Sequence, residues 1–398
     1  MLANIGRLEQ HMRGAELDAL VATSAENVYY LTGIGSITLE MFPHVGHSSA
    51  LLTAEDLGKV HAVWFRGDID QLLNTPGYVS SYFPYGTFYR EAPPEVALTN
   101  EEIQLKEIAV DSRGEDSAVA ALKAAIKSAG VLGHRIGVDE TGISAEFYGL
   151  LSTQLHGTEL IPAGNLLRSI RKVKTEEEID RLTRSAEVAE TGILAAVSAI
   201  ADGTTEGELV SEFEKAVVAF GARPKFTLIK VGRGGVAGQA APRDVGIRRG
   251  DTVWFDVGLI HNGYWADIAR VFSFGEPADR AVEAYGAMLS GEEFALRNTR
   301  AGMSGGEIFD STVTAVREAG VPGYRRHHVG HGIGVEVYDQ VLLTPGNRDV
   351  VEEGTVVNIE TPYYEFGLGA VHVEDPFVVQ ADGNRLLTKL SRELTVVD

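Results

Sequence analysis

The sequence contains no cysteine among its 398 residues. This absence excludes disulfide bonds, thiolate-held metals and a cysteine nucleophile. Any metal ion must therefore be bound by His, Asp or Glu side chains, which suit hard or borderline divalent ions.

Basic residues are also scarce, because 35 Lys and Arg stand against 56 Asp and Glu, a formal net charge of -21. Nucleic-acid binding needs clustered basic side chains, so we expect no nucleic-acid partner. No apolar run approaches membrane-spanning length, and the first twenty residues carry three acids, unlike a secretory signal. These features predict a cytoplasmic protein without a membrane partner.

The first part of the chain alternates helical and extended patterns. Residues 4–23 predict a helix followed by a strand, and residues 49–64 predict two strands around a turn. Residues 116–140 predict a helix and then a strand over 135–138. This alternation is typical of an α/β domain, which we expect to span residues 1–165.

Capping boxes predict where helices begin in residues 166–398, and glycines predict where they end. A further helix is expected over roughly 279–297. The capping pairs are Thr175 and Glu178, Thr205 and Glu208, and Ser304 and Glu307, with helix ends near Gly203, Gly221 and Gly320.

The order of helices and strands then recurs, which predicts an internal duplication. The segment DGTTEGE at 202–208 matches AGMSGGE at 301–307. GDTVWFD, which ends at Asp256, matches GTVVNIE, which ends at Glu360. On this alignment the strand bearing Asp267 corresponds to the one bearing Glu374. The alternative is a chance similarity between two units of the same kind.

One hairpin predicts a close pair of acids. If Asn262 and Gly263 form a two-residue type I′ turn, Asp256 lies opposite Ala269. Residues two apart on a strand share a face, so Asp267 then points the same way as Asp256. Like charges on a half-buried face repel unless a cation lies between them. The alternative is a solvated outer face, where no cation is needed.

Further candidate ligands lie near the C-terminus. Glu360 ends an apolar run, and alternation places His372 and Glu374 on one face. His331 lies between glycines that permit close packing around its ring. Alone, His331 would be interpreted as a histidine of the core. Beside four acids on strands, it is better interpreted as a metal ligand. Such a set suits two divalent ions, whose shared water becomes a nucleophile near neutral pH.

These residues are spaced as in a known family. The segments are DVGLIHNGYWAD at 256–267, GHGIGVE at 330–336, NIETPYY at 358–364 and VHVED at 371–375. In order they resemble the Asp, Asp, His, Glu, Glu set of the creatinase/prolidase branch of the pita-bread metallohydrolases, which includes Xaa-Pro dipeptidase and aminopeptidase P. Residues 18–34 are similar to the creatinase-type N-terminal domain, so the resemblance covers nearly the whole chain.

The resemblance implies an α+β protein with a pita-bread catalytic domain over 166–398, after a creatinase-type α/β domain over 1–165. It implies two divalent metal ions, with Mn²⁺ favoured and Co²⁺, Fe²⁺ or Zn²⁺ as alternatives. It also implies a homodimer in which the N-terminal domain borders the partner's site. The substrate would be a short peptide or another small molecule.

The resemblance further implies a role for each candidate residue. Asp256 would chelate the first ion, Asp267 and Glu374 would bridge both ions, and His331 and Glu360 would complete the second. Glu360 would also be catalytic, by helping to deprotonate the attacking water, and His327, four positions before His331, would contact the substrate. His328 matches no family role and is expected to be a packing or surface residue.

Three positions depart from the proline-peptidase pattern. Tyr338, seven positions after His331, and Gln239, seventeen before Asp256, stand where histidines are usual. His372, two positions before the last ligand, stands where arginine is common. These three are expected to be substrate-side or supporting residues. Tyr338 could donate a hydrogen bond to an oxyanion or serve only as a packing aromatic.

The leading hypothesis is a dinuclear metal hydrolase that cleaves a C–N amide bond through a metal-bridging hydroxide, as an Xaa-Pro dipeptidase or aminopeptidase. A second hypothesis keeps the fold and metals but takes a small non-peptide substrate, as creatinase-like or ectoine-hydrolase-like relatives do. The missing histidines favour it. A third is a catalytically inactive binding module, which the complete ligand set disfavours.

Overall fold

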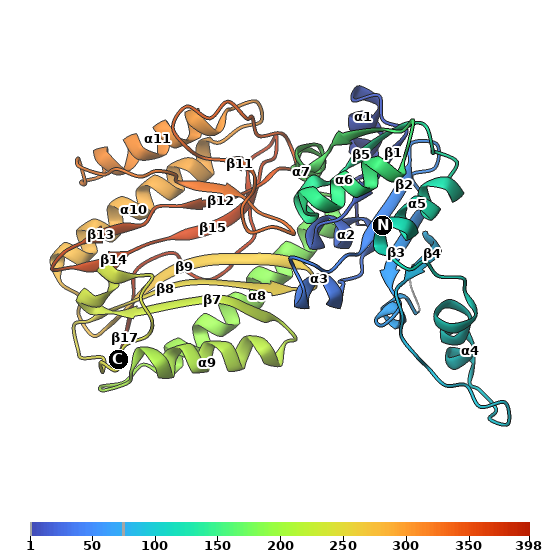
Figure 1. The fold of residues 1–398 in the computed structure, drawn as a ribbon. Helices are drawn as coiled ribbons and strands as arrows, with labels where there is room; N and C mark the ends of the chain where they lie inside the picture. Colours follow the sequence, from blue (N-terminus) through green and yellow to red (C-terminus); the bar gives the residue numbers. More distant parts are fainter. Residues whose placement is uncertain (1, 74–75) are drawn as a thin grey trace. The chain divides into compact units, whose positions relative to one another are not determined.

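The computed structural model describes residues 2–73 and 76–398 and divides into two compact units (Figure 1). One unit ends at Arg171 and the other begins at Lys172. The sequence placed the domain boundary after residue 165, which falls inside α7 (Gly164–Arg171). Leu167 and Ile170 of this helix are fully buried in the core of the first unit. The units therefore separate where the helix ends.

The first unit is an α/β domain with the strand order β4-β3-β2-β1-β5-β6. The helix and strands expected over 4–23 and 49–64 are confirmed as α1, β1, β2 and β3. Its strands are β1 (Ala19–Ala22), β2 (Ser49–Thr53), β3 (Val60–Phe65), β4 (Val79–Tyr85), β5 (Arg135–Val138) and β6 (Glu159–Pro162). Before α7, its helices are α1 (Ile5–Gly14), α2 (Ala25–Thr32), α3 (Ile37–Met41), α4 (Asn100–Lys106), α5 (Ala118–Ser128) and α6 (Ala145–Gln154), with short turns η1 (Ile69–Leu72), η2 (Glu107–Asp111) and η3 (Glu140–Gly142).

The second unit is built on one large sheet with the strand order β11-β10-β12-β15-β9-β8-β7. Its helices are α8 (Glu176–Ser198), α9 (Glu206–Ala219), α10 (Asp279–Asn298) and α11 (Gly305–Glu318), with the short η4 (Gly232–Ala237). Its strands are β7 (Arg223–Val231), β8 (Thr252–His261), β9 (Tyr264–Phe274), β10 (Gly330–Gly332), β11 (Asp339–Leu342), β12 (Val356–Glu360), β13 (Tyr363–Glu365), β14 (Gly369–Val371), β15 (Glu374–Val378), β16 (Arg385–Leu386) and β17 (Thr395–Val397). Within the described ranges, every helix of the chain is too short or too polar to span a lipid bilayer.

The helix starts predicted from capping boxes are confirmed for α8, α9 and α11. In each box the N-cap hydroxyl accepts a hydrogen bond from the third helical residue, whose carboxylate accepts one from the N-cap amide. The end of α8 differs from the prediction, because the helix stops at Ser198 instead of near Gly203. Gly203 instead belongs to the following turn, where its amide donates to the Ile247 carbonyl.

The second unit has the symmetry expected of an internal duplication. The strands β7, β8 and β9 on one side of the sheet mirror β10, β12 and β15 on the other. The N-caps of α9 and α11 make equivalent bridges, Thr205 with Gly246 and Ser304 with Val350. The two segments aligned in the sequence therefore occupy matching places in the fold.

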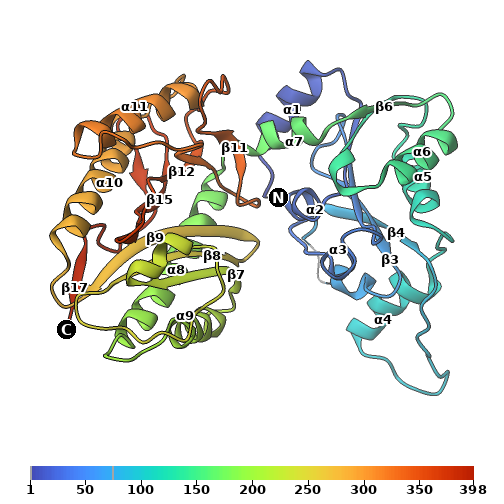
Figure 2. The ribbon, with the colours of Figure 1, turned by 60° about the vertical axis from the view of Figure 1, so that its left-hand side comes forward.

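The helices α8, α9, α10 and α11 pack against one face of this sheet (Figure 2). Phe255 and Val257 of β8 pack in a core with α8 and α9, and Val357 and Ile359 of β12 pack with α10 and α11. Because alternate residues face opposite ways, Asp256 and the other predicted acidic ligands lie on the face away from the helices. The predicted acidic ligands thus gather on the side of the sheet that the helices leave free.

The hairpin of β8 and β9 has the register that the sequence predicted. Asn262 and Gly263 have φ angles of 47° and 76°, as a type I′ turn requires. Asp256 pairs with Ala269, and Asp267 therefore shares its face. This confirms the parity on which the metal-site prediction depends.

A buried acid at the start of α8 predicts a pH dependence of stability. Glu178 is 1% exposed, beside Lys174 and the Tyr264 hydroxyl, and burial raises its pKa from 4.5 to about 7. The folded state therefore binds this proton more tightly than the unfolded state does. The stabilisation that results is complete below pH 4.5 and is lost as pH rises to 7. Glutamine has no carboxyl proton to lose, so the free energy of unfolding of Glu178→Gln should rise relative to that of wild type as pH rises. We expect a difference of up to about 3 kcal/mol between urea unfolding at pH 4.5 and at pH 8.

Glu208 provides a matched control from an exposed capping box. The amide and hydroxyl of Thr205 donate to its carboxylate and lower its pKa, so its stabilisation is present at neutral pH and lost on acidification. Glu208→Gln should therefore change stability with the opposite pH trend. Parallel trends in the two variants would contradict the assignment for Glu178.

Candidate metal centre

Three of the predicted ligands lie in one row across the sheet of the second unit. Asp256 on β8 pairs with Ala269 on β9, and Ala269 pairs with Glu374 on β15. Glu374 in turn pairs with Glu360 on β12. Since paired residues of neighbouring strands point to the same side, these carboxylates lie side by side.

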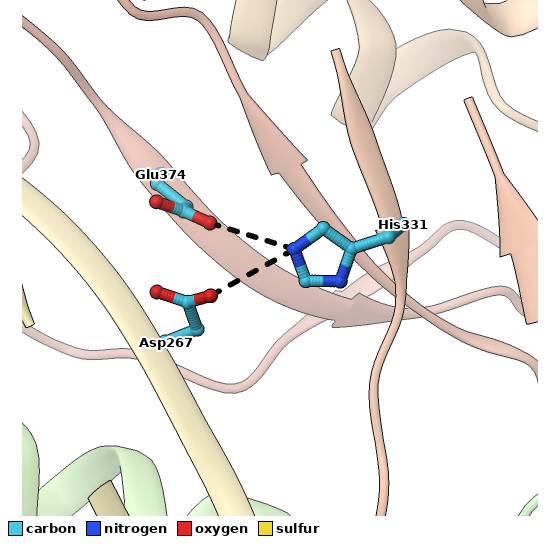
Figure 3. Close-up of side chains that lie close together, drawn as sticks. All are labelled: Asp267, His331 and Glu374. Atoms are coloured by element: carbon cyan, nitrogen blue, oxygen red, sulfur yellow. Dashed lines mark ion pairs between the residues drawn. The ribbon is translucent and has the colours of Figure 1, made fainter. Parts of the chain in front are cut away.

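His331 completes one group with Asp267 and Glu374 (Figure 3). Its Nε2 lies 3.7 Å from Asp267 Oδ2 and 3.9 Å from Glu374 Oε1. Its Nδ1 lies 3.0 Å from the Gly332 carbonyl, which can only accept a hydrogen bond, so Nδ1 carries the proton. Burial also lowers the pKa of His331, which keeps the ring neutral. The lone pair of Nε2 is therefore aimed at two carboxylates, the arrangement of a metal-binding histidine.

The glycines around His331 allow this close packing, as the sequence predicted. A Cβ on Gly330, whose φ is 144°, would lie 2.2 Å from the Asn358 carbonyl oxygen. A Cβ on Gly332 would lie 1.9 Å from the Gln340 carbonyl oxygen. A side chain at either position would push β10 away from its neighbours and displace the histidine.

His372 lies within a second group, beside Glu360 and Glu374. Its Nε2 is 3.4 Å from Glu374 Oε2 and 3.9 Å from Glu360 Oε2, and its Nδ1 is 3.9 Å from Asp256 Oδ2. Burial lowers the pKa of His372 to about 3, so this ring is also neutral. The sequence predicted its face correctly but not its place among the carboxylates.

The electrostatics of the cluster favour a bound cation. Burial and the negative charge of Glu360 raise the pKa of Asp256 to about 8. Burial and repulsion between neighbouring carboxylates raise the pKa values of Asp267 and Glu374 well above their ordinary range. These acids can all ionise near neutral pH only when positive charge is supplied among them.

Several buried polar atoms of the cluster lack hydrogen-bond partners, as expected of atoms that bind divalent ions. Among the described residues, Asp267 Oδ1, His331 Nε2 and both ring nitrogens of His372 are buried without a hydrogen-bond partner. Buried polar atoms are rarely left in this state, because each unmade bond costs about 1–3 kcal/mol. Carboxylate oxygens and neutral imidazole nitrogens are ligands that divalent transition metals accept.

A cavity of about 430 Å³ opens onto this cluster and brings most of the other predicted residues together. His327 and Gln239 are exposed on its wall, and Tyr338 and His372 also line it. Asp256 and Glu360 reach the same space, whereas Asp267, His331 and Glu374 are not among the lining residues.

Tyr338 packs on the ring of His331, with the ring centres 3.9 Å apart and the planes at 19°. Burial and the nearby carboxylates raise the pKa of its phenol above the ordinary value of 10. The hydroxyl therefore stays protonated near neutral pH, and the ring fixes the histidine by stacking. This contact favours the packing role that the sequence left open, without excluding hydrogen-bond donation.

Three residues near the ligands were not predicted from the sequence. His328 was expected to be a packing or surface residue, but its Nδ1 lies 2.9 Å from Glu360 Oε1. Arg326 lines the cavity, with Nη2 3.9 Å from Glu360 Oε2. The Asn358 amide donates to Glu374 Oε1 over 2.7 Å. Strand alternation could have found Asn358, two positions before Glu360, but no local signal indicates the other two.

Comparisons with known proteins place the sequence in a family. Residues 180–381 match the model of "Metallopeptidase family M24", and residues 79–173 match "Creatinase/Prolidase N-terminal domain". An Xaa-Pro dipeptidase of Pyrococcus furiosus is 31% identical over 232 residues, which cover 58% of this chain and 67% of that protein.

Solved structures show the same fold along nearly the whole chain. The X-Pro aminopeptidase of Thermotoga maritima superposes with a TM-score of 0.74 and 23% identity over 99% of both chains. The N-terminal domain of the FACT complex subunit SPT16 from chickpea superposes with a TM-score of 0.68 and 14% identity, over 99% of this chain and 98% of that one. Because a protein named as a FACT subunit shares the fold, the fold by itself does not assign the activity. The family match covers half of the sequence, and by it the chain belongs to metallopeptidase family M24 and is a hydrolytic enzyme of that family.

Proposed function

We propose that this hydrolase cleaves a C–N amide bond with two divalent ions, and that Xaa-Pro dipeptides are its first substrate class. The observation that carries the proposal is the convergence of buried carboxylates on the lone pair of His331. Asp256, Asp267, His331, Glu360 and Glu374 would hold the two ions. Their predominance of oxygen favours Mn²⁺, with Co²⁺, Fe²⁺ and Zn²⁺ as alternatives.

When bound, divalent ions would supply Lewis-acid chemistry that polarises the substrate carbonyl and acidifies a water molecule. Glu360, which with Asp256 reaches the cavity, would accept the proton that this water releases. His328, whose Nδ1 lies 2.9 Å from Glu360 Oε1, would pass a proton towards the leaving nitrogen. His327 on the cavity wall contacts the substrate. Asn358 holds the Glu374 carboxylate in one orientation through its amide.

A second candidate function is hydrolysis of a small non-peptide amide or amidine. It is favoured by Tyr338, which stands where the proline-specific peptidases usually have a histidine. This tyrosine stacks on His331. Because its pKa is raised, this phenol is a poor proton shuttle near neutral pH. Gln239 on the cavity wall likewise cannot exchange protons as a histidine would. The homodimer and the cytoplasmic location stay predictions.

A side-by-side activity screen with Mn²⁺ tests the proposal. Xaa-Pro dipeptides, longer Xaa-Pro peptides, creatine and ectoine are incubated with the enzyme, with and without a chelator. We expect turnover of the dipeptides that the chelator abolishes. Turnover of creatine or ectoine alone would select the second candidate. No turnover of any of them by a fully metal-loaded enzyme would contradict both substrate classes.

A further inference from the structure

The position of His372 is unusual for a histidine that only supports the site. Its side chain is 2% exposed and is surrounded by Asp256, Glu360 and Glu374. The ring of Trp254 stacks on the imidazole with an offset, with the ring centres 6.2 Å apart and the planes at 25°. The imidazole is therefore held in the middle of the acidic cluster.

Neither ring nitrogen of His372 makes a hydrogen bond to any described residue. Its distances of 3.4 Å to Glu374 Oε2 and 3.9 Å to Glu360 Oε2 exceed those of ordinary hydrogen bonds. A supporting histidine would donate to one of these oxygens at about 2.8 Å. The spacing instead leaves room between the nitrogen and the oxygens.

That spacing is close to what a shared ion requires. Ligand atoms about 2.1 Å from one ion lie about 3.0 Å apart at right angles and about 3.4 Å apart in a tetrahedron. Nε2 of His372 and one oxygen each of Glu360 and Glu374 all lie within 4.8 Å of one another. The 3.4 Å between Nε2 and Glu374 Oε2 already matches two ligands of one tetrahedral ion, and the 3.9 Å to Glu360 Oε2 would have to shorten by about 0.5 Å.

We propose that His372 is itself a metal ligand, which binds through Nε2 the ion that Glu360 also binds. This inference rests on the proposed function, because it needs the divalent centre proposed there. It departs from the family pattern, which puts His331 and Glu360 on one ion, because it gives each of the two groups in the structure a histidine, His331 in one and His372 in the other. The added nitrogen shifts the preference of that position towards Co²⁺ and Zn²⁺ relative to Mn²⁺.

The test separates a ligand from a hydrogen-bond donor. Arginine can donate to carboxylates but has no lone pair for a metal, and phenylalanine can do neither. We therefore compare His372→Arg and His372→Phe with wild type, each stripped and reloaded with Co²⁺. His261→Phe, a histidine at the far end of β8, is the matched control. Far-UV circular dichroism of each metal-free protein checks the fold.

The first readout is Co²⁺ affinity by calorimetric titration, with metal content by mass spectrometry. We expect both His372 variants to bind one of the two ions at least tenfold more weakly, and the His261 variant to match wild type. The second readout is the proton NMR spectrum of the Co²⁺ protein. There, each bound histidine gives one shifted, exchangeable N–H signal, so we expect two in wild type and one in His372→Phe.

The outcomes also separate this inference from the proposed function. Wild-type affinity for both ions in His372→Arg, or one shifted N–H signal in wild type, would overturn the ligand role. If wild type itself binds no Co²⁺, the proposed divalent centre fails and the inference fails with it. Loss of one ion in both His372 variants with the fold intact would support the ligand role.

Discussion

Replacing Glu360 with glutamine should lower kcat by at least about a thousandfold while the protein stays folded. Glutamine has the same shape as glutamate, so the strand pairing of Glu360 with Glu374 is retained. The neutral amide cannot accept a proton from the attacking water. Steady-state kinetics on the best substrate from the screen, with metal content measured on the same sample, give the comparison.

Glu365→Gln is the control for this variant. Glu365 is on β13 of the same unit, where it pairs with Arg280 over 2.7 Å and is not among the residues of the catalytic cavity. This change should leave kcat within about twofold of wild type, since exposed ion pairs contribute little. A Glu360→Gln enzyme that keeps more than a tenth of the wild-type kcat at full metal occupancy would remove Glu360 from the chemistry.

Removal of the divalent ions should abolish turnover and lower the free energy of unfolding. A ligand at a thousand times its Kd stabilises a folded protein by about 4 kcal/mol, and chelation removes that amount. Relief of the repulsion among the buried carboxylates is one source of that binding energy. Thermal unfolding with and without chelator measures it, and full activity in the stripped protein would contradict the mechanism.

Asp267→Asn is the informative partner of the chelation experiment. Asp267 is 4% exposed and feels the charges of Asp256 and Glu360. Without metal, the amide should make the folded state more stable than wild type at pH 8, because burial and the neighbouring carboxylates raise the pKa of Asp267 and so disfavour its ionised form. Adding the metal should raise the free energy of unfolding of this variant by less than it raises that of wild type. Equal metal-induced gains in the two proteins would place the ions elsewhere.

The acidic face of the sheet was predictable because the hairpin sets its own register. Asn262 and Gly263 specify a two-residue turn, and counting back from it fixes which residues share the face of Asp256. The same parity placed His372 beside Glu374 and put Asp375 on the other face, where it pairs with Arg270 over 2.7 Å. Local rules suffice where one turn or one strand decides the geometry.

Contacts between distant segments were not predictable in this way. The two halves of the sheet meet where Glu374 pairs with Ala269, and no local pattern specifies that register. His328 and Arg326 precede β10 in an irregular segment, so alternation could not show which of them turns towards Glu360. The predicted boundary after residue 165 differs from the division after Arg171 for a similar reason, because the core contacts of α7 decide to which unit the helix belongs.

The central claim is that this acidic face holds two divalent ions, and anomalous X-ray diffraction from Mn²⁺-loaded crystals tests it most directly. The account predicts two anomalous peaks over the sheet. Between them, the two peaks should lie within bonding distance of all five proposed ligands, Asp256, Asp267, His331, Glu360 and Glu374. A single peak elsewhere, or none in crystals of an enzyme that is active under the same conditions, would contradict it.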